Sequence, residues 1–131
     1  MKLNTPSLAM AAVMLCLLLV GTTLSAHHSF SAFNMDSEET ITGKVRQVDW
    51  TNPHIWIWLD VANEDGEEET WGMEGMSPNY LARRGWTKDT LQTGDEITAT
   101  IRPMKDGKKG GMFVRTTLGD GTTLTMGGGS N

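Results

Sequence analysis

The amino-acid sequence predicts a mainly β protein, a small OB-like barrel of five or six strands with one short helix between strands three and four. Three observations predict this fold. Apolar and polar residues alternate in several short segments, turn residues separate those segments, and a complete set of helix-capping residues follows the third one. Three strands, one helix and two strands is the order of the OB barrel, and closure removes exposed sheet edges. A small β-sandwich is the alternative, but a helix in this position suits it less well.

Residues 1–26 have the features of a cleavable secretory signal peptide. One positive charge precedes an uninterrupted apolar run over residues 8–20, and a short stretch ending at Ala26 follows it. The run is shorter than the ~20 residues that cross a bilayer. We therefore expect cleavage after Ala26, a mature chain that begins at His27, a periplasmic location and no stable membrane anchor.

The mature chain, residues 27–131, has the length of one domain. We expect an N-terminal arm (27–38), the barrel (39–126) and a flexible tail (127–131). The single cysteine, Cys16, lies inside the signal, so the mature chain has no thiol for a disulfide, a nucleophile or a thiolate metal site. Acidic residues outnumber basic ones, and this net negative charge argues against a nucleic-acid partner.

The first strand is expected over residues 39–50. Ile41 and Val45 share one face by alternation, whereas Val48 continues out of phase. This slip predicts a β-bulge near residues 46–47, which would help the strand to coil into a small barrel.

The next two strands are expected as a hairpin over residues 54–61 and 67–74, joined by a turn at Asp65-Gly66. Alternation separates the apolar residues of the first of these strands from its two tryptophans. One face holds Ile55, Ile57, Leu59 and Val61, and the other holds Trp56, Trp58 and Asp60. On the returning strand, Trp71 and Met73 form the apolar side.

The helix has recognisable signals at both ends. Ser77 is a typical N-cap and Pro78 fits the first helical position. Gly85 suits the left-handed residue after the helix, and Leu81 with Trp86 would form the apolar contact of a Schellman motif.

The remaining strands are expected over residues 95–103 and 112–118, with a short last strand over 122–126. A hairpin loop over residues 105–111 joins the first two of them. The last strand would be a sixth one, added to the five of the barrel.

Five short motifs occur in order along the chain: AHHSF at 26–30, WTNPH at 50–54, SPN-x-LAR-x-GW at 77–86, GD at 94–95 and DG-x-x-GG at 106–111. They resemble a family of small secreted bacterial proteins that is known only as a domain of unknown function. The resemblance implies an exported, periplasmic protein of a Gram-negative bacterium. It implies no activity.

The histidines are the first candidate ligands. Cleavage after residue 26 gives His27 both an α-amine and an imidazole, and His28 adds a second imidazole. Such nitrogen sites suit Cu(II), which leads the divalent affinity order. His54 lies at a strand start that the arm would reach, and Phe30 and Phe33 would pin the arm onto the barrel.

Methionines are the second set of candidate ligands, because thioethers are soft and suit Cu(I). Met73 and Met76, which flank Gly75 just before the helix, are the expected pair. The opposing interpretation is structural: the paired histidines form a solvated start, His54 caps a turn, and methionines such as Met73 and Met112 fill the core.

The tryptophans offer a different kind of site. Trp56, Trp58 and Trp71 lie on neighbouring predicted strands, and in OB barrels strands two and three often form the ligand face. Exposed indoles there would stack on a ligand or partner. The alternative is that these tryptophans supply the core.

Other charged segments and enzyme motifs give weaker signals. The acidic run at 67–69 has no calcium-loop spacing, and the basic loop at 105–109 fits a solvated turn or an acidic partner. The mature sequence offers no cysteine nucleophile, serine elbow or HExxH pair. His27 with His54 is the one arrangement that leaves oxidative copper chemistry open.

We therefore expect a small periplasmic binding protein that is not an enzyme, with copper as its ligand. The predicted copper ligands are His27, His28, His54, Met73 and Met76. The alternative is a non-metal interaction module that docks a periplasmic protein partner or a small ligand on the face of Trp56, Trp58 and Trp71.

Overall fold

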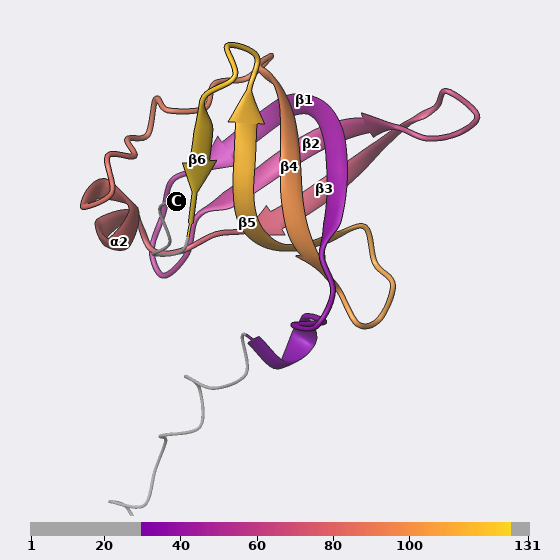
Figure 1. Ribbon diagram of the computed structural model, residues 1–131, viewed down its shortest axis with the longest axis horizontal. Coiled ribbons are helices and arrows are strands. Elements are labelled where there is room, and N and C mark those ends of the chain that lie inside the picture. Colours follow the sequence, from indigo (N-terminus) through magenta and orange to yellow (C-terminus); the bar gives the residue numbers. More distant parts are fainter. Residues whose placement is uncertain (1–29, 127–131) are drawn as a thin grey trace, which may run out of the picture.

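The computed structural model describes residues 30–126 of the chain. Its elements, in chain order, are η1 (Phe30–Ala32), β1 (Glu39–Asp49), β2 (Trp56–Ala62), β3 (Glu68–Glu74), α2 (Pro78–Ala82), β4 (Glu96–Pro103), β5 (Gly110–Leu118) and β6 (Thr123–Thr125) (Figure 1). Five strands form a closed barrel, with one extra strand and one short helix. The predicted mainly β, OB-like class is therefore confirmed.

The strands form one sheet in the order β3-β2-β1-β4-β5-β6, which closes because β3 also pairs with β5. The β3–β5 pair is parallel, whereas the other pairs are antiparallel. The long, curved β1 pairs with β4 through residues 39–44 and with β2 through residues 44–49 (Figure 1). Its curvature lets one strand serve both halves of the barrel.

The predicted bulge in β1 is confirmed. Val45 lies opposite Leu59 and Gln47 lies opposite Trp58, so that Arg46 is the extra residue. A bulge shifts the alternation of side chains by one position. Both halves of β1 therefore turn their apolar residues into the barrel.

The core fills the inside of the barrel with apolar side chains from every strand of the ring. Its fully buried members include Val45, Ile55, Ile57, Leu59, Met73, Ile97, Ile101 and Phe113. Leu81 of α2 and Trp86 after it complete the cluster, and the Trp86 ring meets Phe113 edge to face at 6.1 Å between centroids. The helix thus contributes to the same core as the strands.

The helix ends are held as the sequence predicts. Ser77 Oγ accepts a hydrogen bond from the Tyr80 N–H at 3.3 Å. At the other end, the Trp86 N–H donates to the Leu81 carbonyl at 3.1 Å, and Gly85 has a φ of +85°. These features confirm the Schellman motif.

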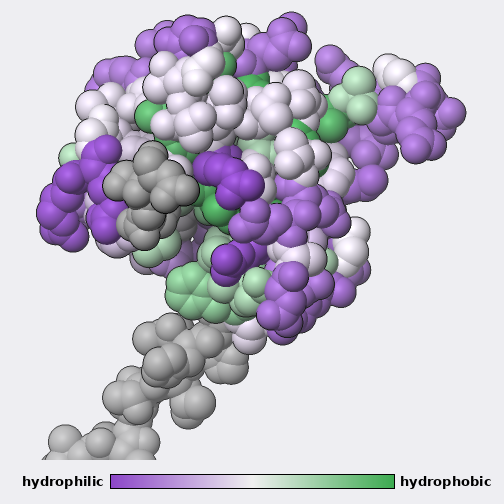
Figure 2. Space-filling model, viewed as in Figure 1, coloured by the Kyte–Doolittle hydropathy of each residue, from purple (hydrophilic) through white to green (hydrophobic). Residues whose placement is uncertain are grey.

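The arm lies against the barrel through Phe33, which is 3% exposed and forms an isolated bridge with Met104. The Asn34 N–H also donates to the Pro103 carbonyl at 2.8 Å. Phe30 is 48% exposed, so of the two predicted anchors only Phe33 is buried. Figure 2 shows a mostly hydrophilic face with an apolar area beside the start of the described chain. Within residues 30–126, no helix has the length and apolarity needed to cross a membrane.

Two strands start two residues away from the predicted position, and three others start one residue later than predicted. His54 and Ile55 precede β2, although the Ile55 N–H still donates to the Met76 carbonyl at 3.1 Å. β5 begins at Gly110, so the last two residues of the predicted loop over 105–111 belong to the strand.

The reason for the early start of β5 is the closure of the barrel. Gly110 lies opposite Gly72 in the parallel β3–β5 pair. A Cβ on Gly110 would lie 2.1 Å from the Gly72 carbonyl oxygen, and a Cβ on Gly111 would lie 2.2 Å from the Arg102 carbonyl oxygen. Only residues without a side chain permit this approach, so closure of the barrel requires glycine at positions 110 and 111.

We predict that Gly110→Ala destabilises the protein by ~3 kcal/mol, because it combines a steric clash with a positive φ of 146°. Gly107→Ala is the matched control: its φ is also positive, at 75°, but nothing lies within 4 Å of the added Cβ. The control should lose only ~1 kcal/mol. Urea unfolding of both variants measures the difference, and equal losses would contradict the role given to Gly110.

Candidate metal site

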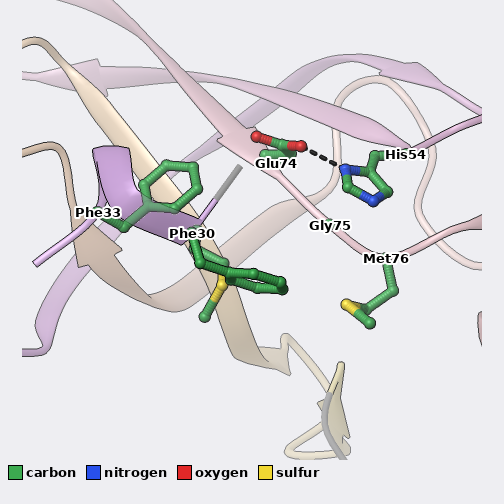
Figure 3. Close-up of a pocket in the computed structure, with 7 residues that line it drawn as sticks. Phe30, Phe33, His54, Glu74, Gly75 and Met76 are labelled. Carbon is green, nitrogen blue, oxygen red and sulfur yellow. Dashed lines mark hydrogen bonds and ion pairs between the residues drawn. The ribbon is translucent and has the colours of Figure 1, made fainter. Parts of the chain in front are cut away.

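A small pocket lies where the arm, the start of β2, the end of β3 and β5 meet. It is lined by Phe30, Phe33, His54, Glu74, Gly75, Met76 and Met112 (Figure 3). Its cavity volume is about 10 Å³, which is room for about one water molecule or one ion. Four separate segments of the chain therefore converge on a space of atomic size.

A histidine–carboxylate pair forms one wall of this pocket. His54 Nδ1 hydrogen-bonds the Glu74 carboxylate, and the second ring nitrogen faces away from Glu74 (Figure 3). In the neutral tautomer in which the carboxylate accepts the Nδ1–H, Nε2 carries the free lone pair. Side-chain exposures of 31% for His54 and 16% for Glu74 leave the ring reachable from outside. Metal-binding histidines usually have this kind of carboxylate partner.

Backbone contacts hold the two segments of the pair together. The Gly75 N–H donates to the Ile55 carbonyl at 2.9 Å, and the Ile55 N–H donates back to Met76. A Cβ on Gly75 would lie 2.7 Å from the Ile55 side chain, so glycine is needed for this close packing. His54 and Met76 are thereby fixed on the same pocket by main-chain structure rather than by a loose loop.

The structure separates the two methionines that the sequence pairs. Met76 is half-buried and lines the pocket, whereas Met73 is 0% exposed and packs in the barrel core. Met73 lies opposite Ile57, on the inward face of β3. It therefore cannot reach the pocket, and for this residue the core-filling alternative is the correct one.

Met112 is a pocket residue that sequence reasoning assigned to the core. The parallel register of β3 and β5 places it opposite Glu74, where it is half-buried. Its strand alternation alone indicates an apolar position but not which cavity it lines. The β3–β5 pairing of a closed barrel is the signal that would have identified it.

The other two predicted ligands, His27 and His28, lie outside the described residues. The described chain begins at Phe30, which lines the pocket. Among the described residues, no group of three or more histidine, cysteine, aspartate or glutamate side chains is placed to hold a metal. A complete site therefore needs thioether ligands or residues before Phe30.

The three tryptophans do not form one face, which corrects the predicted ligand surface. Trp56 and Trp58 stack on each other outside the barrel, with ring centroids 5.6 Å apart. Trp71 lies opposite Leu59 and packs against the core. The cause is the register of β2 and β3, which places Gly72 rather than Trp71 opposite Trp58.

The predicted basic loop is partly neutralised by acidic neighbours. Lys108 forms an ion pair with Asp106 and Lys109 forms one with Glu69, each at 2.9 Å. The hydrogen bond from Lys109 also holds the pKa of Glu69 below its ordinary value. These contacts fit a solvated loop tip.

Fold and pocket together define the class: a small OB-like barrel protein with a histidine–methionine pocket beside the point where its arm meets the barrel. The chain belongs to the family of unknown function DUF6152, whose sequence profile matches residues 14–114. No curated protein and no solved structure matches this chain.

The exposed tryptophan pair yields a prediction about pH. Asp49 accepts hydrogen bonds from the Gln47 amide and from Trp58 Nε1, the latter at 2.9 Å, and these bonds lower the pKa of its carboxyl group. A lowered folded-state pKa stabilises the protein above the ordinary aspartate value of 3.8, and this contribution is lost as the pH falls through the folded-state pKa. Trp58→Phe should therefore raise the pKa of Asp49.

An NMR titration of the Asp49 carboxyl carbon measures the effect. Trp56→Phe makes the same change on the neighbouring ring. Trp56 lies opposite Asp49 across the strands, but no side-chain hydrogen bond joins its indole to the Asp49 carboxylate among the described contacts. It should leave the titration unchanged. An equal shift in both variants would show that ring burial, and not the indole N–H, sets the pKa.

Proposed function

We propose that this protein is an exported copper-binding protein. Its ligands are the α-amine and imidazole of His27, the imidazole of His28, Nε2 of His54 and the thioether of Met76. One observation carries the proposal: His54, oriented by Glu74, lies beside Met76 in a pocket whose wall includes Phe30. Phe30 is only two residues from His28.

The short length of chain between Phe30 and the two N-terminal histidines supports their role as ligands at the pocket. An extended chain advances by at most about 3.6 Å per residue. The Cα of His28 is therefore within about 7 Å of the Cα of Phe30, and that of His27 within about 11 Å. Both imidazoles are within reach of the pocket.

The ligand chemistry favours copper over other divalent ions. Nitrogen ligands follow an affinity order in which Cu(II) leads, and residues 27–131, the proposed mature chain, contain no cysteine whose thiolate would favour zinc. The Glu74 carboxylate hydrogen-bonds His54 Nδ1 and so orients the ring, as the carboxylate partners of metal-binding histidines do.

A binding role suits the site better than catalysis. The cavity of about 10 Å³ accommodates an ion but no organic substrate. Its walls are filled by phenylalanine and methionine side chains. The proposal is accordingly one of metal binding, delivery or storage in the compartment that an exported protein reaches.

Two N-terminal changes test the copper site. Titration of the mature protein with Cu(II) should give an affinity at least about tenfold weaker for His27→Ala and for a variant with one extra residue before His27. The first change removes an imidazole, and the second moves the α-amine away. His54→Ala should weaken binding as well. Met73→Leu is the control, because Met73 is in the core and should leave the affinity unchanged.

Processing at residue 26 is tested separately. Protein isolated from the periplasm of cells that express the full chain should have an intact mass that corresponds to residues 27–131, because the α-amine of His27 exists only after this cleavage. A different N-terminus would remove His27 as an amine ligand and contradict the proposed ligand set.

The stacked pair Trp56–Trp58 favours a second candidate function. These rings lie half-exposed on the outer face of β2, where OB barrels often bind ligands. If both N-terminal variants bind Cu(II) as tightly as the unaltered protein, copper binding through the arm is rejected. Docking of a partner protein or small ligand on Trp56 and Trp58 then becomes the better account.

A further inference from the structure

We propose that the pocket itself is a selective Cu(I) site, in which His54 Nε2 and the thioethers of Met76 and Met112 are the ligands. The nitrogen ligands of the arm would serve Cu(II). This inference rests on the proposed copper function and deepens it, since it assigns the two oxidation states to two sets of ligands. It also adds Met112, which the sequence alone does not select.

The ligand set consists of neutral and mostly soft donors. Met76 follows β3 and Met112 belongs to β5, and both side chains line the pocket with His54. Thioethers favour Cu(I), whereas Cu(II) favours amine and imidazole nitrogens in tetragonal geometry. The Glu74 carboxylate, which would attract a dication, is engaged with His54 Nδ1.

The register of the barrel brings the two methionines to one pocket. Met112 lies opposite Glu74 in the parallel β3–β5 pair, and Met76 follows Glu74 by two residues. In Figure 3 the Met76 side chain lies below His54, on the side to which its second ring nitrogen points, and the Phe30 ring lies below Glu74. The β3–β5 pairing and the chain that follows β3 therefore bring both methionines to the pocket that His54 lines.

The surroundings of the pocket also favour a singly charged ion. Phe30, Phe33 and the methionine chains line it, and its volume leaves no room for a shell of water around an ion. The cost of removing an ion from water grows with the square of its charge, so it is about four times larger for Cu(II) than for Cu(I). An apolar cavity of this size thus discriminates against divalent ions.

The other described methionines are placed elsewhere. Met73 and Met126 are buried in the core, and Met104 pairs with Phe33 at the base of the arm. Met35 is exposed, and its sulfur lies 3.8 Å from the guanidinium of Arg102. Met35 is therefore a suitable control, as a thioether that is not part of the pocket.

The test is an anaerobic Cu(I) competition with a chromogenic chelator, run beside a Cu(II) titration on the same mature proteins. Met76→Leu and Met112→Leu should each weaken Cu(I) binding about tenfold, and the double variant about a hundredfold. The Cu(II) affinity of Met112→Leu should stay within about twofold of that of the unaltered protein, because Met112 is not among the ligands proposed for Cu(II). Met35→Leu should change neither affinity. Leucine replaces methionine at nearly constant volume, and circular dichroism confirms that each variant is folded.

The outcomes separate this inference from the proposed function. If the two leucine variants keep full Cu(I) affinity while the arm variants weaken Cu(II) binding, the thioether site is rejected and the arm site stands. If Met112→Leu weakens Cu(I) and Cu(II) binding equally, the pocket binds copper without selectivity, and the inference is also rejected. If no variant in either series alters either affinity, the proposed copper function fails together with this inference.

Discussion

The parallel pairing of β3 with β5 is the constraint on which the rest of the structure depends. It closes the barrel through Gly72 and Gly110, whose backbones approach too closely for any side chain at Gly110. The same pairing sets the register that brings Met112 to Glu74. Closure therefore does two things at once: it removes the edges that a small sheet would expose, and it assembles one wall of the pocket.

The barrel also divides the residues of β2 and β3 between two environments. Alternation directs Ile57 and Met73 into the core, where they are fully buried, and leaves Trp56 and Trp58 outside. His54 comes just before β2, and Glu74 is the last residue of β3. Polar and soft side chains therefore gather where the strands leave the core, because a buried strand interior would not tolerate an unpaired imidazole or carboxylate.

The arm links the barrel to the segment from which the remaining copper ligands would come. Phe33 is buried and bonded to the barrel, and Phe30 lines the pocket while remaining half-exposed. The Phe30 ring therefore lies between the pocket and the solvent and partly covers this small site. The arm thus brings Phe30 to the pocket lined by His54, which local pairing with Glu74 already orients.

The sequence by itself determined the features that depend on neighbouring residues. The alternation of the strands, the bulge at Arg46 and both helix caps follow from local sterics and hydrogen bonding, and the structure confirms them. Tertiary structure decided which side chains meet across strands. Register placed Met112 in the pocket, Met73 in the core and Trp71 away from Trp58, although all three lie on strands that the sequence predicts. Cross-strand register is set by closure of the whole barrel, and no local pattern contains it.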